Sequence, residues 1–310
     1  MATRKKPMPN WNDLLEEIKQ AGSQFDIIRR KYLAALHEHT QRNVIVYYSG
    51  WLEKPVVHPH QRIAFEINDQ DKNGFMTCIH KLDRSKGLDL LLHTPGGSMA
   101  ATESLVTYLR AMFDTDIRTI IPQIAMSGGT MVACASREII MGKQSSLGPI
   151  DPQVFGFPAE GIVKEFERAH QEITAAPHMG AFWGPVLAKY TPSMYQECNH
   201  AIDWCKQMVK EWLVTGMFLG EDDATTKADD VLTKLRDQAL TLSHSRHISL
   251  EKAEEASLKV VSLEDDDTLQ DLVLTVHYSC IQTLSSTPAM KIIENHLGKA
   301  FISQMPIPPQ

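Results

Sequence analysis

Between residues 71 and 141, short apolar segments alternate with amphipathic ones, and this rhythm constrains the fold more than any other feature. The apolar segments are nearly continuous, which predicts strands buried on both faces of a sheet; they lie at 88–93, 117–121 and 138–141. A further strand is expected over 44–49, where β-branched and aromatic residues are concentrated. Strands that alternate with helices indicate a parallel sheet covered by helices and joined by right-handed crossovers. The predicted fold class is therefore α/β.

Helical periodicity predicts the remaining elements and suggests how the chain is divided. Within the α/β region, helices are expected over 71–82, 99–113 and 128–136. After about residue 158 strand signals become rare, and helices are expected over 159–176, 192–218, 222–240 and most of 264–298. We therefore expect four segments: an N-terminal helical segment (1–40), an α/β core (41–158), a helical extension (159–262) and C-terminal helices with a tail (263–310).

Composition argues against several classes of protein. The chain has 31 Lys and Arg residues against 38 Asp and Glu residues, so its formal net charge is −7, which disfavours coating of nucleic acid or of an anionic membrane. No signal-peptide apolar region follows the basic N-terminus, and no apolar stretch predicts a membrane span. The five cysteines include no Cys-x-x-Cys pair, so we expect reduced thiols, no metal site and a cytoplasmic protein.

The first chemical signal is the turn His93-Thr-Pro-Gly-Gly-Ser98, which follows a strand and opens a helix. Gly96 and Gly97 can adopt positive φ angles and present bare amide groups, which could hold a phosphate or a developing oxyanion. Neither a phosphate-binding GxxxxGK[ST] loop nor a dinucleotide GxGxxG motif is present. Taken alone, the segment is better explained as a tight structural turn.

The second signal is Ala125-Met-Ser-Gly-Gly-Thr-Met131, again between an apolar strand and a helix. Ser127 at this helix start could be an N-cap or a nucleophile. Parallel strands end at the same edge of a sheet, so we expect the amides of the first turn to lie beside the Ser127 hydroxyl. An oxyanion cradle next to a nucleophile is the arrangement that acyl transfer requires, with Gly128 as a further amide donor.

Three segments, in this order, resemble the Clp protease/crotonase superfamily; they are 91–98 (LLHTPGGS), 125–131 (AMSGGTM) and 146–153 (SLGPIDPQ). The sequence is most similar to the serine dehydrogenase proteinase family, which is related to the Clp peptidase and to signal peptide peptidase A, over about residues 40–262. The resemblance implies stacked ββα units with a largely parallel sheet and additional C-terminal helices. It also implies a serine endopeptidase with its catalytic core at 41–158, a peptide or protein substrate, a homo-oligomer and no cofactor.

The serine needs a base. The Clp peptidase has a histidine in the strand after the helix, but the matching stretch, 147–152, contains none. Downstream of the serine, the sequence around His244 resembles a motif of the serine dehydrogenase proteinases. The resemblance places His244 on the family's catalytic histidine, and the family's triad has the chain order Ser, Asp, His. Asp151 would then orient the imidazole, and His247 is the fallback base.

Three alternatives stay open. One is a Ser–Lys dyad, as in the signal peptide peptidase relatives, with Lys143 or Lys164 as the base. Another is crotonase-like acyl-CoA chemistry, in which paired amides hold a thioester enolate and no nucleophile is needed. The last is an inactive assembly scaffold, in which Ser127 only caps its helix. The sequence specifies neither the substrate, nor the size of the oligomer, nor an unfoldase partner.

Overall fold

The computed structural model describes residues 16–17, 25–54, 62–236 and 245–305. Its centre is a seven-stranded sheet with the order β11-β10-β1-β2-β3-β5-β9. The strands are β1 (Asn43–Ser49), β2 (Leu88–His93), β3 (Ile117–Ile121), β5 (Glu138–Met141), β9 (Val260–Ser262), β10 (Ala289–Asn295) and β11 (Ala300–Gln304). The five strands from β1 to β9 are parallel, whereas β10 and β11 form an antiparallel hairpin beside β1. The predicted Clp/crotonase-like α/β fold with a largely parallel sheet is confirmed.

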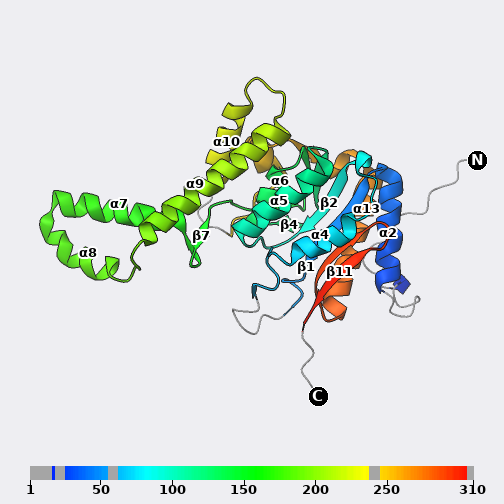
Figure 1. The fold of residues 1–310 in the computed structure, drawn as a ribbon, viewed down its shortest axis with the longest axis horizontal. Coiled ribbons are helices and arrows are strands. Elements are labelled where there is room, and N and C mark those ends of the chain that lie inside the picture. Colours follow the sequence, from blue (N-terminus) through cyan, green and yellow to red (C-terminus); the bar gives the residue numbers. More distant parts are fainter. Residues whose placement is uncertain (1–15, 18–24, 55–61, 237–244, 306–310) are drawn as a thin grey trace, which may run out of the picture.

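Helices cover both faces of this sheet (Figure 1). They are α2 (Phe25–Thr40), α4 (Asp71–Ile79), α5 (Met99–Phe113), α6 (Gly128–Cys134), α9 (Met194–Trp212), α10 (Ala224–Arg236), α12 (Leu250–Glu255) and α13 (Asp267–Ser286). Strand β1 shows why two layers are needed, since its side chains alternate between two cores. Val46 and Tyr48 pack with α2 and α13, whereas Ile45 and Tyr47 pack with α4 on the opposite face. A strand buried on both faces reads as an unbroken apolar run, as the sequence predicted.

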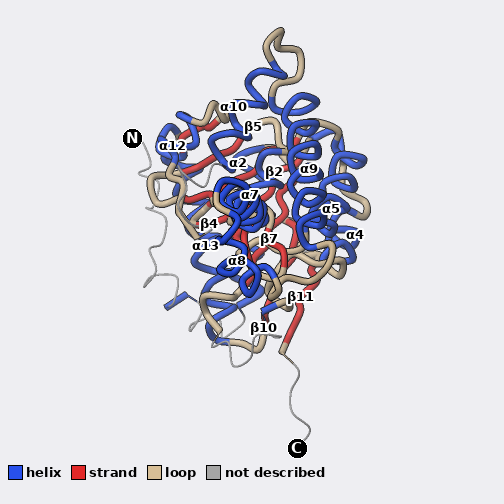
Figure 2. Tube along the Cα trace, turned by 90° about the vertical axis from the view of Figure 1, so that its left-hand side faces the viewer, coloured by secondary structure: helices blue, strands red, loops and turns tan. Residues whose placement is uncertain are grey.

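Helices α7 (Ala159–Ala175) and α8 (Gly180–Leu187) project from the sheet as an arm, together with the start of α9 (Figure 1), and Figure 2 looks along this arm toward the sheet. A small separate core holds α7 against α9; it consists of Ala159, Ile162, Val163, Met194 and Cys198. A short hairpin of β7 (Gln153–Val154) and β8 (Phe157–Pro158) leads into the arm. Phe182 of α8 is 61% exposed and Phe157 of β8 is 64% exposed, so the arm presents apolar surface to solvent.

The expectation that 264–298 is mostly helical is wrong at its C-terminal end. Helix α13 ends at Ser286, and β10 and β11 follow it as a hairpin. The error has a physical cause: Lys291 and Glu294 look like solvent-facing charges, yet both are buried in ion pairs with distant residues. Strand β9 and helix α8 were also not predicted. Most of the first 24 residues of the expected N-terminal helical segment (1–40) lie outside the described residues.

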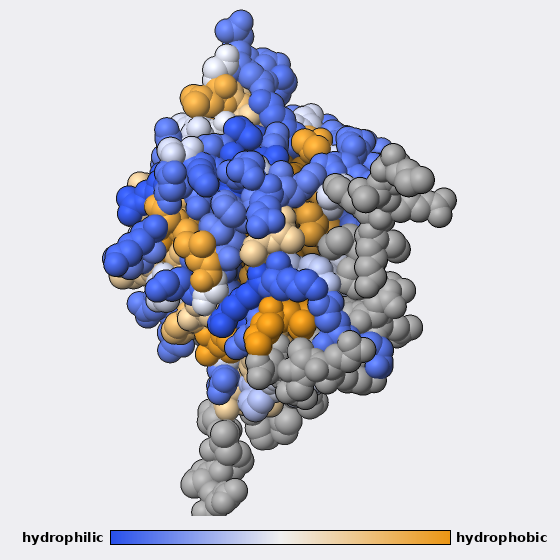
Figure 3. All heavy atoms as spheres, turned by 90° about the vertical axis from the view of Figure 1, so that its right-hand side faces the viewer, coloured by the Kyte–Doolittle hydropathy of each residue, from blue (hydrophilic) through white to orange (hydrophobic). Residues whose placement is uncertain are grey.

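None of the helices in the described ranges combines the length and the apolarity that crossing a bilayer requires. The face that carries α2 is predominantly hydrophilic, with separate small apolar patches (Figure 3). All five cysteines are buried and free of disulfide bonds, and burial raises the pKa of Cys78, Cys134, Cys205 and Cys280 to about 12.

Candidate active site

The first glycine turn connects β2 to α5. Ser98 is a true N-cap of α5, because its Oγ accepts a hydrogen bond from the amide of Ala101. Gly96 has φ +95°, which a side chain would strain, and a Cβ at Gly97 would stand 2.3 Å from the amide nitrogen of Ile67. Both positions therefore require glycine in this conformation.

The second turn connects β4 (Ile124–Ala125) to α6 and places Ser127 at the helix start. Unlike Ser98, Ser127 makes no capping hydrogen bond, and its backbone has φ +50° and ψ −114°. A non-glycine residue in this region is strained, and such residues cluster at functional sites. Within the described part of the chain, the half-buried Ser127 hydroxyl has no hydrogen-bond partner. The N-cap explanation for Ser127 therefore lacks the hydrogen bond that it needs.

Backbone hydrogen bonds bring the two turns together, as predicted. The Thr94 amide donates to Ile124 O at 3.2 Å, and the Met126 amide donates to Thr94 O at 3.0 Å. The contact is so close that a Cβ built on Gly96 would lie 2.7 Å from Ser127 Cβ. The glycine turn thus packs directly against Ser127.

The structure distinguishes between the three glycines predicted as oxyanion donors. The Gly96 amide already donates to Thr94 Oγ1 at 3.1 Å, so it is engaged by the turn itself. The amides of Gly97 and Gly128 have no acceptor among the described residues, and a Cβ on Gly128 would lie 3.4 Å from the Gly97 nitrogen. Two neighbouring unengaged amides next to a serine hydroxyl can stabilise an oxyanion.

His93, which ends β2, is a packing residue and not a base. Its ring nitrogens lie 3.0 Å from Gln123 Oε1 and 3.2 Å from Ser49 O, and the ring stacks on Tyr48. Burial lowers the pKa of His93 to about 4. Both ring nitrogens face oxygen atoms of Gln123 and Ser49, so His93 links β2 to the segment before β4.

A row of paired residues crosses the site from the first turn to the helical extension. Thr94 pairs with Ala125, Ala125 pairs with Leu147 of β6 (Ser146–Leu147), and Leu147 pairs with Ile248. Both backbone hydrogen bonds between Leu147 and Ile248 are 2.9 Å long. The extension is therefore built into the same layer as the serine, and the exposed His247 directly precedes Ile248. His244 lies outside the described residues.

The other predicted site residues are not brought to Ser127 by any contact within the described residues. Asp151 is buried in the loop after β6, where its Oδ2 accepts a hydrogen bond from Gln153 Nε2 at 2.9 Å. Lys143 is exposed in the turn after β5, and Lys164 is exposed on α7 in the arm. A lysine base needs a desolvated amine, so exposure of both side chains disfavours the Ser–Lys dyad.

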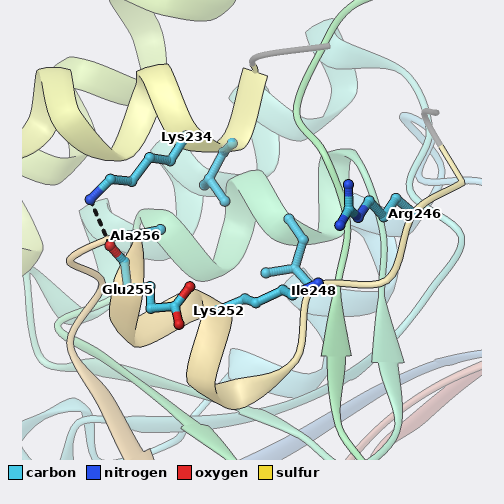
Figure 4. Close-up of a pocket in the computed structure, with 7 residues that line it drawn as sticks. Lys234, Arg246, Ile248, Lys252, Glu255 and Ala256 are labelled. Carbon is cyan, nitrogen blue, oxygen red and sulfur yellow. Dashed lines mark hydrogen bonds between the residues drawn. The ribbon is translucent and has the colours of Figure 1, made fainter. Parts of the chain in front are cut away.

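A cavity of about 310 Å³ lies beside the Ile248 segment, between α10 and α12 (Figure 4). Its lining consists of Lys234, Leu235, Arg246, Ile248, Lys252, Glu255 and Ala256. Lys234 is already engaged, since its Nζ donates to Asp230 at 2.7 Å and to the Glu255 carbonyl at 2.6 Å. The cavity borders the site through two backbone contacts, one of which is the hydrogen bond from the Ile150 amide to Leu235 O.

Sequence reasoning missed Ile67. Its amide donates to Gly96 O at 2.7 Å and its carbonyl accepts from the Ser98 amide at 3.0 Å, so it fixes the outer edge of the glycine turn. No pattern in the sequence marks this residue, because it lies in a segment between two predicted elements and acts through its backbone.

The fold has the ClpP-like α/β arrangement that the sequence predicted, and comparison with known proteins agrees. Residues 27–178 match the family described as ClpP-like SDH-type serine proteinases, so this part of the chain is similar to that family. Two similar proteins, both from Methanocaldococcus jannaschii, are uncharacterized protein MJ0137, 39% identical over 102 residues, and uncharacterized protein MJ1495, 34% identical over 108 residues. The matches cover 33% and 35% of this chain, and 35% and 37% of the two relatives, so the chain spans about a third of their length.

Proposed function

We propose that the protein is a serine peptidase that cleaves peptide bonds through an acyl-enzyme at Ser127. The observation that carries the proposal is the conformation of Ser127: a strained residue at a helix start, with an uncapped hydroxyl beside the unengaged amides of Gly97 and Gly128. Similarity to a family of ClpP-like serine proteinases supports the same reaction.

In the proposed reaction, Ser127 Oγ attacks the peptide carbonyl carbon while a base takes the hydroxyl proton. The carbonyl oxygen becomes an oxyanion that accepts hydrogen bonds from the Gly97 and Gly128 amides. Collapse of the tetrahedral intermediate releases the amine, which receives the proton from the base, and leaves an ester on Ser127. Water, activated by the same base, then hydrolyses the ester.

We assign the base to the segment from His244 to His247. The supporting observation is that Ile248, the next residue, pairs with β6 in the row that also contains Ala125, two residues before the serine. His244 is the first choice by family motif, and His247 is the alternative. Asp151, in the loop after β6, is the proposed orienting carboxylate.

We also propose that the protein acts as a cytoplasmic homo-oligomer. Each chain would consist of the four segments 1–40, 41–158, 159–262 and 263–310. The exposed aromatic side chains of the β7–β8 hairpin and of the arm support self-association, because isolated chains rarely expose several of them together; they are Phe155, Phe157 and Phe182. Sedimentation of Phe157→Ser and Phe182→Ser variants tests this. A monomeric wild-type protein, or variants with unchanged mass, would contradict it.

A fluorophosphonate probe tests the reaction, because it labels only activated serines. We expect labelling of the wild type, none of Ser127→Ala, and normal labelling of Ser98→Ala, which removes the genuine N-cap of the other turn. An inert wild type favours the scaffold, and turnover of an acyl-CoA by Ser127→Ala favours crotonase-like chemistry. His244→Ala and His247→Ala identify the base, whereas loss of labelling only in Lys143→Ala or Lys164→Ala would establish the Ser–Lys dyad.

A further inference from the structure

A buried ion pair lies next to the first glycine turn. Lys291 of β10 places Nζ 2.7 and 2.9 Å from the two carboxylate oxygens of Asp71, and both side chains are 3% exposed. Tyr47 of β1 donates from Oη to Asp71 Oδ2 at 2.8 Å. Burial lowers the pKa of Lys291 below its ordinary value, while the charge of Asp71 acts in the opposite direction.

This pair holds the segment 66–68 from both ends. Lys291 Nζ also donates to the carbonyl oxygen of Glu66 at 2.7 Å. The amide of Asn68 donates to Asp71 Oδ2 at 3.0 Å. The residue between them therefore has its backbone fixed on either side by the same ion pair.

That middle residue is Ile67, whose amide and carbonyl bind the glycine turn at Gly96 and Ser98. The pairing directs the backbone of Gly97 away from Ile67, because in a parallel bridge the two hydrogen bonds involve the residues on either side of it. The amide of Gly97 consequently faces the other side of the turn, where it is free of an acceptor among the described residues.

We propose that Lys291 and Asp71 are positioning residues, which hold segment 66–68 so that the Gly97 amide is aimed at the oxyanion. The inference rests on the proposed function. Buried ion pairs contribute little to net stability, since desolvation offsets most of the attraction, so a role in fixing one geometry accounts better for this pair. An oxyanion donor acts only if it is fixed in advance at the position where the charge develops.

The test uses the double variant Lys291→Met/Asp71→Asn, which removes the ion pair without leaving an unpaired charge. The matched control is Arg29→Met/Glu294→Gln, which removes the fully buried ion pair between Arg29 of α2 and Glu294, three residues further along β10, together with the contact of Glu294 with Arg30. Both are assayed as full-length chains, well below their midpoints of thermal unfolding. We expect the first-order rate of Ser127 phosphonylation to fall about tenfold or more in the Lys291/Asp71 variant, with little change in probe affinity. The control should remain within about twofold of the wild type, and equal rates in the two variants would overturn the proposal.

Amide hydrogen exchange separates this inference from the proposed function. In the Lys291/Asp71 variant, the amides of Ile67 and Ser98 should exchange at least about tenfold faster, whereas the control should leave them protected. If the wild type fails to label, the peptidase proposal is lost but exchange still tests the positioning contact. Unchanged protection of these two amides would overturn the inference even if labelling is slow.

Discussion

Ser127 should make the folded protein less stable than a glycine at the same position would. With φ +50° and ψ −114°, the residue lies in a region that glycine enters freely, and such strain costs about 1–3 kcal/mol. A glycine at this position would relieve the strain, but its greater entropy in the unfolded chain would offset about 0.4–1 kcal/mol of that stabilisation. Ser127→Gly should therefore be more stable than Ser127→Ala by about 1–2 kcal/mol, although neither variant should react with a fluorophosphonate.

Ser98 provides the internal comparison, because it begins the helix after the other turn. Its hydroxyl accepts the Ala101 amide, so Ser98→Ala should lose about 1 kcal/mol, whereas Ser127→Ala removes no cap and should be nearly neutral. Urea unfolding of the three variants, followed by circular dichroism, measures these differences as shifts in midpoint at constant slope. A Ser127→Gly variant less stable than Ser127→Ala, or a Ser127→Ala loss as large as that of Ser98→Ala, would refute the argument that this residue is strained and uncapped.

Three further predictions concern a buried histidine, a closely packed glycine and the buried thiols. The pKa of His93 is about 4 in the folded protein and about 6.5 in the unfolded chain, so the unfolded chain binds the proton first as the pH falls. Protonation of His93 alone should therefore lower the free energy of unfolding by about 2 kcal/mol between pH 7 and pH 5. Denaturant titrations of His93→Gln over this range should show a shallower dependence on pH, and an unchanged dependence would contradict the prediction. Gly97→Ala should be labelled about 100-fold more slowly, since a Cβ would stand 2.3 Å from the Ile67 nitrogen and shift the amide; a folded variant with the wild-type rate would exclude Gly97 as a donor. All five thiols are buried, so a disulfide reagent at pH 8 should modify them only on unfolding, and rapid modification of the native protein would be inconsistent with the structure.

The parallel strands could be predicted because their residues are apolar on both faces. Strands β2, β3 and β5 begin and end where the apolar runs do, and the meeting of the two glycine turns followed from the rule that parallel strands end together. Strand β10 could not be predicted, since its Lys291 and Glu294 are buried by partners 220 and 265 residues away in the sequence. A charged residue is predicted to be exposed to solvent unless its buried partner is already known.

The candidate site likewise has features that the sequence predicts and features that it does not. Ser127 and the glycines were found because each needs a particular residue type in a local turn, but the two roles of the serine could be separated only by its backbone angles and its missing cap. Ile67 acts through backbone groups that any residue possesses, so its contribution leaves no trace in the sequence. The identity of the base depends on the placement of His244, which lies outside the described residues.

The position of β10 has a consequence for biosynthesis. Strand β1 is near the start of the chain, yet one of its two neighbours in the sheet is supplied by residues 289–295. Until the ribosome has released that stretch, the hydrogen-bonding groups along one side of β1 face no strand, and an open edge of apolar residues invites pairing between nascent chains. Translation that stops before residue 289 should therefore give aggregates and not a smaller soluble protein.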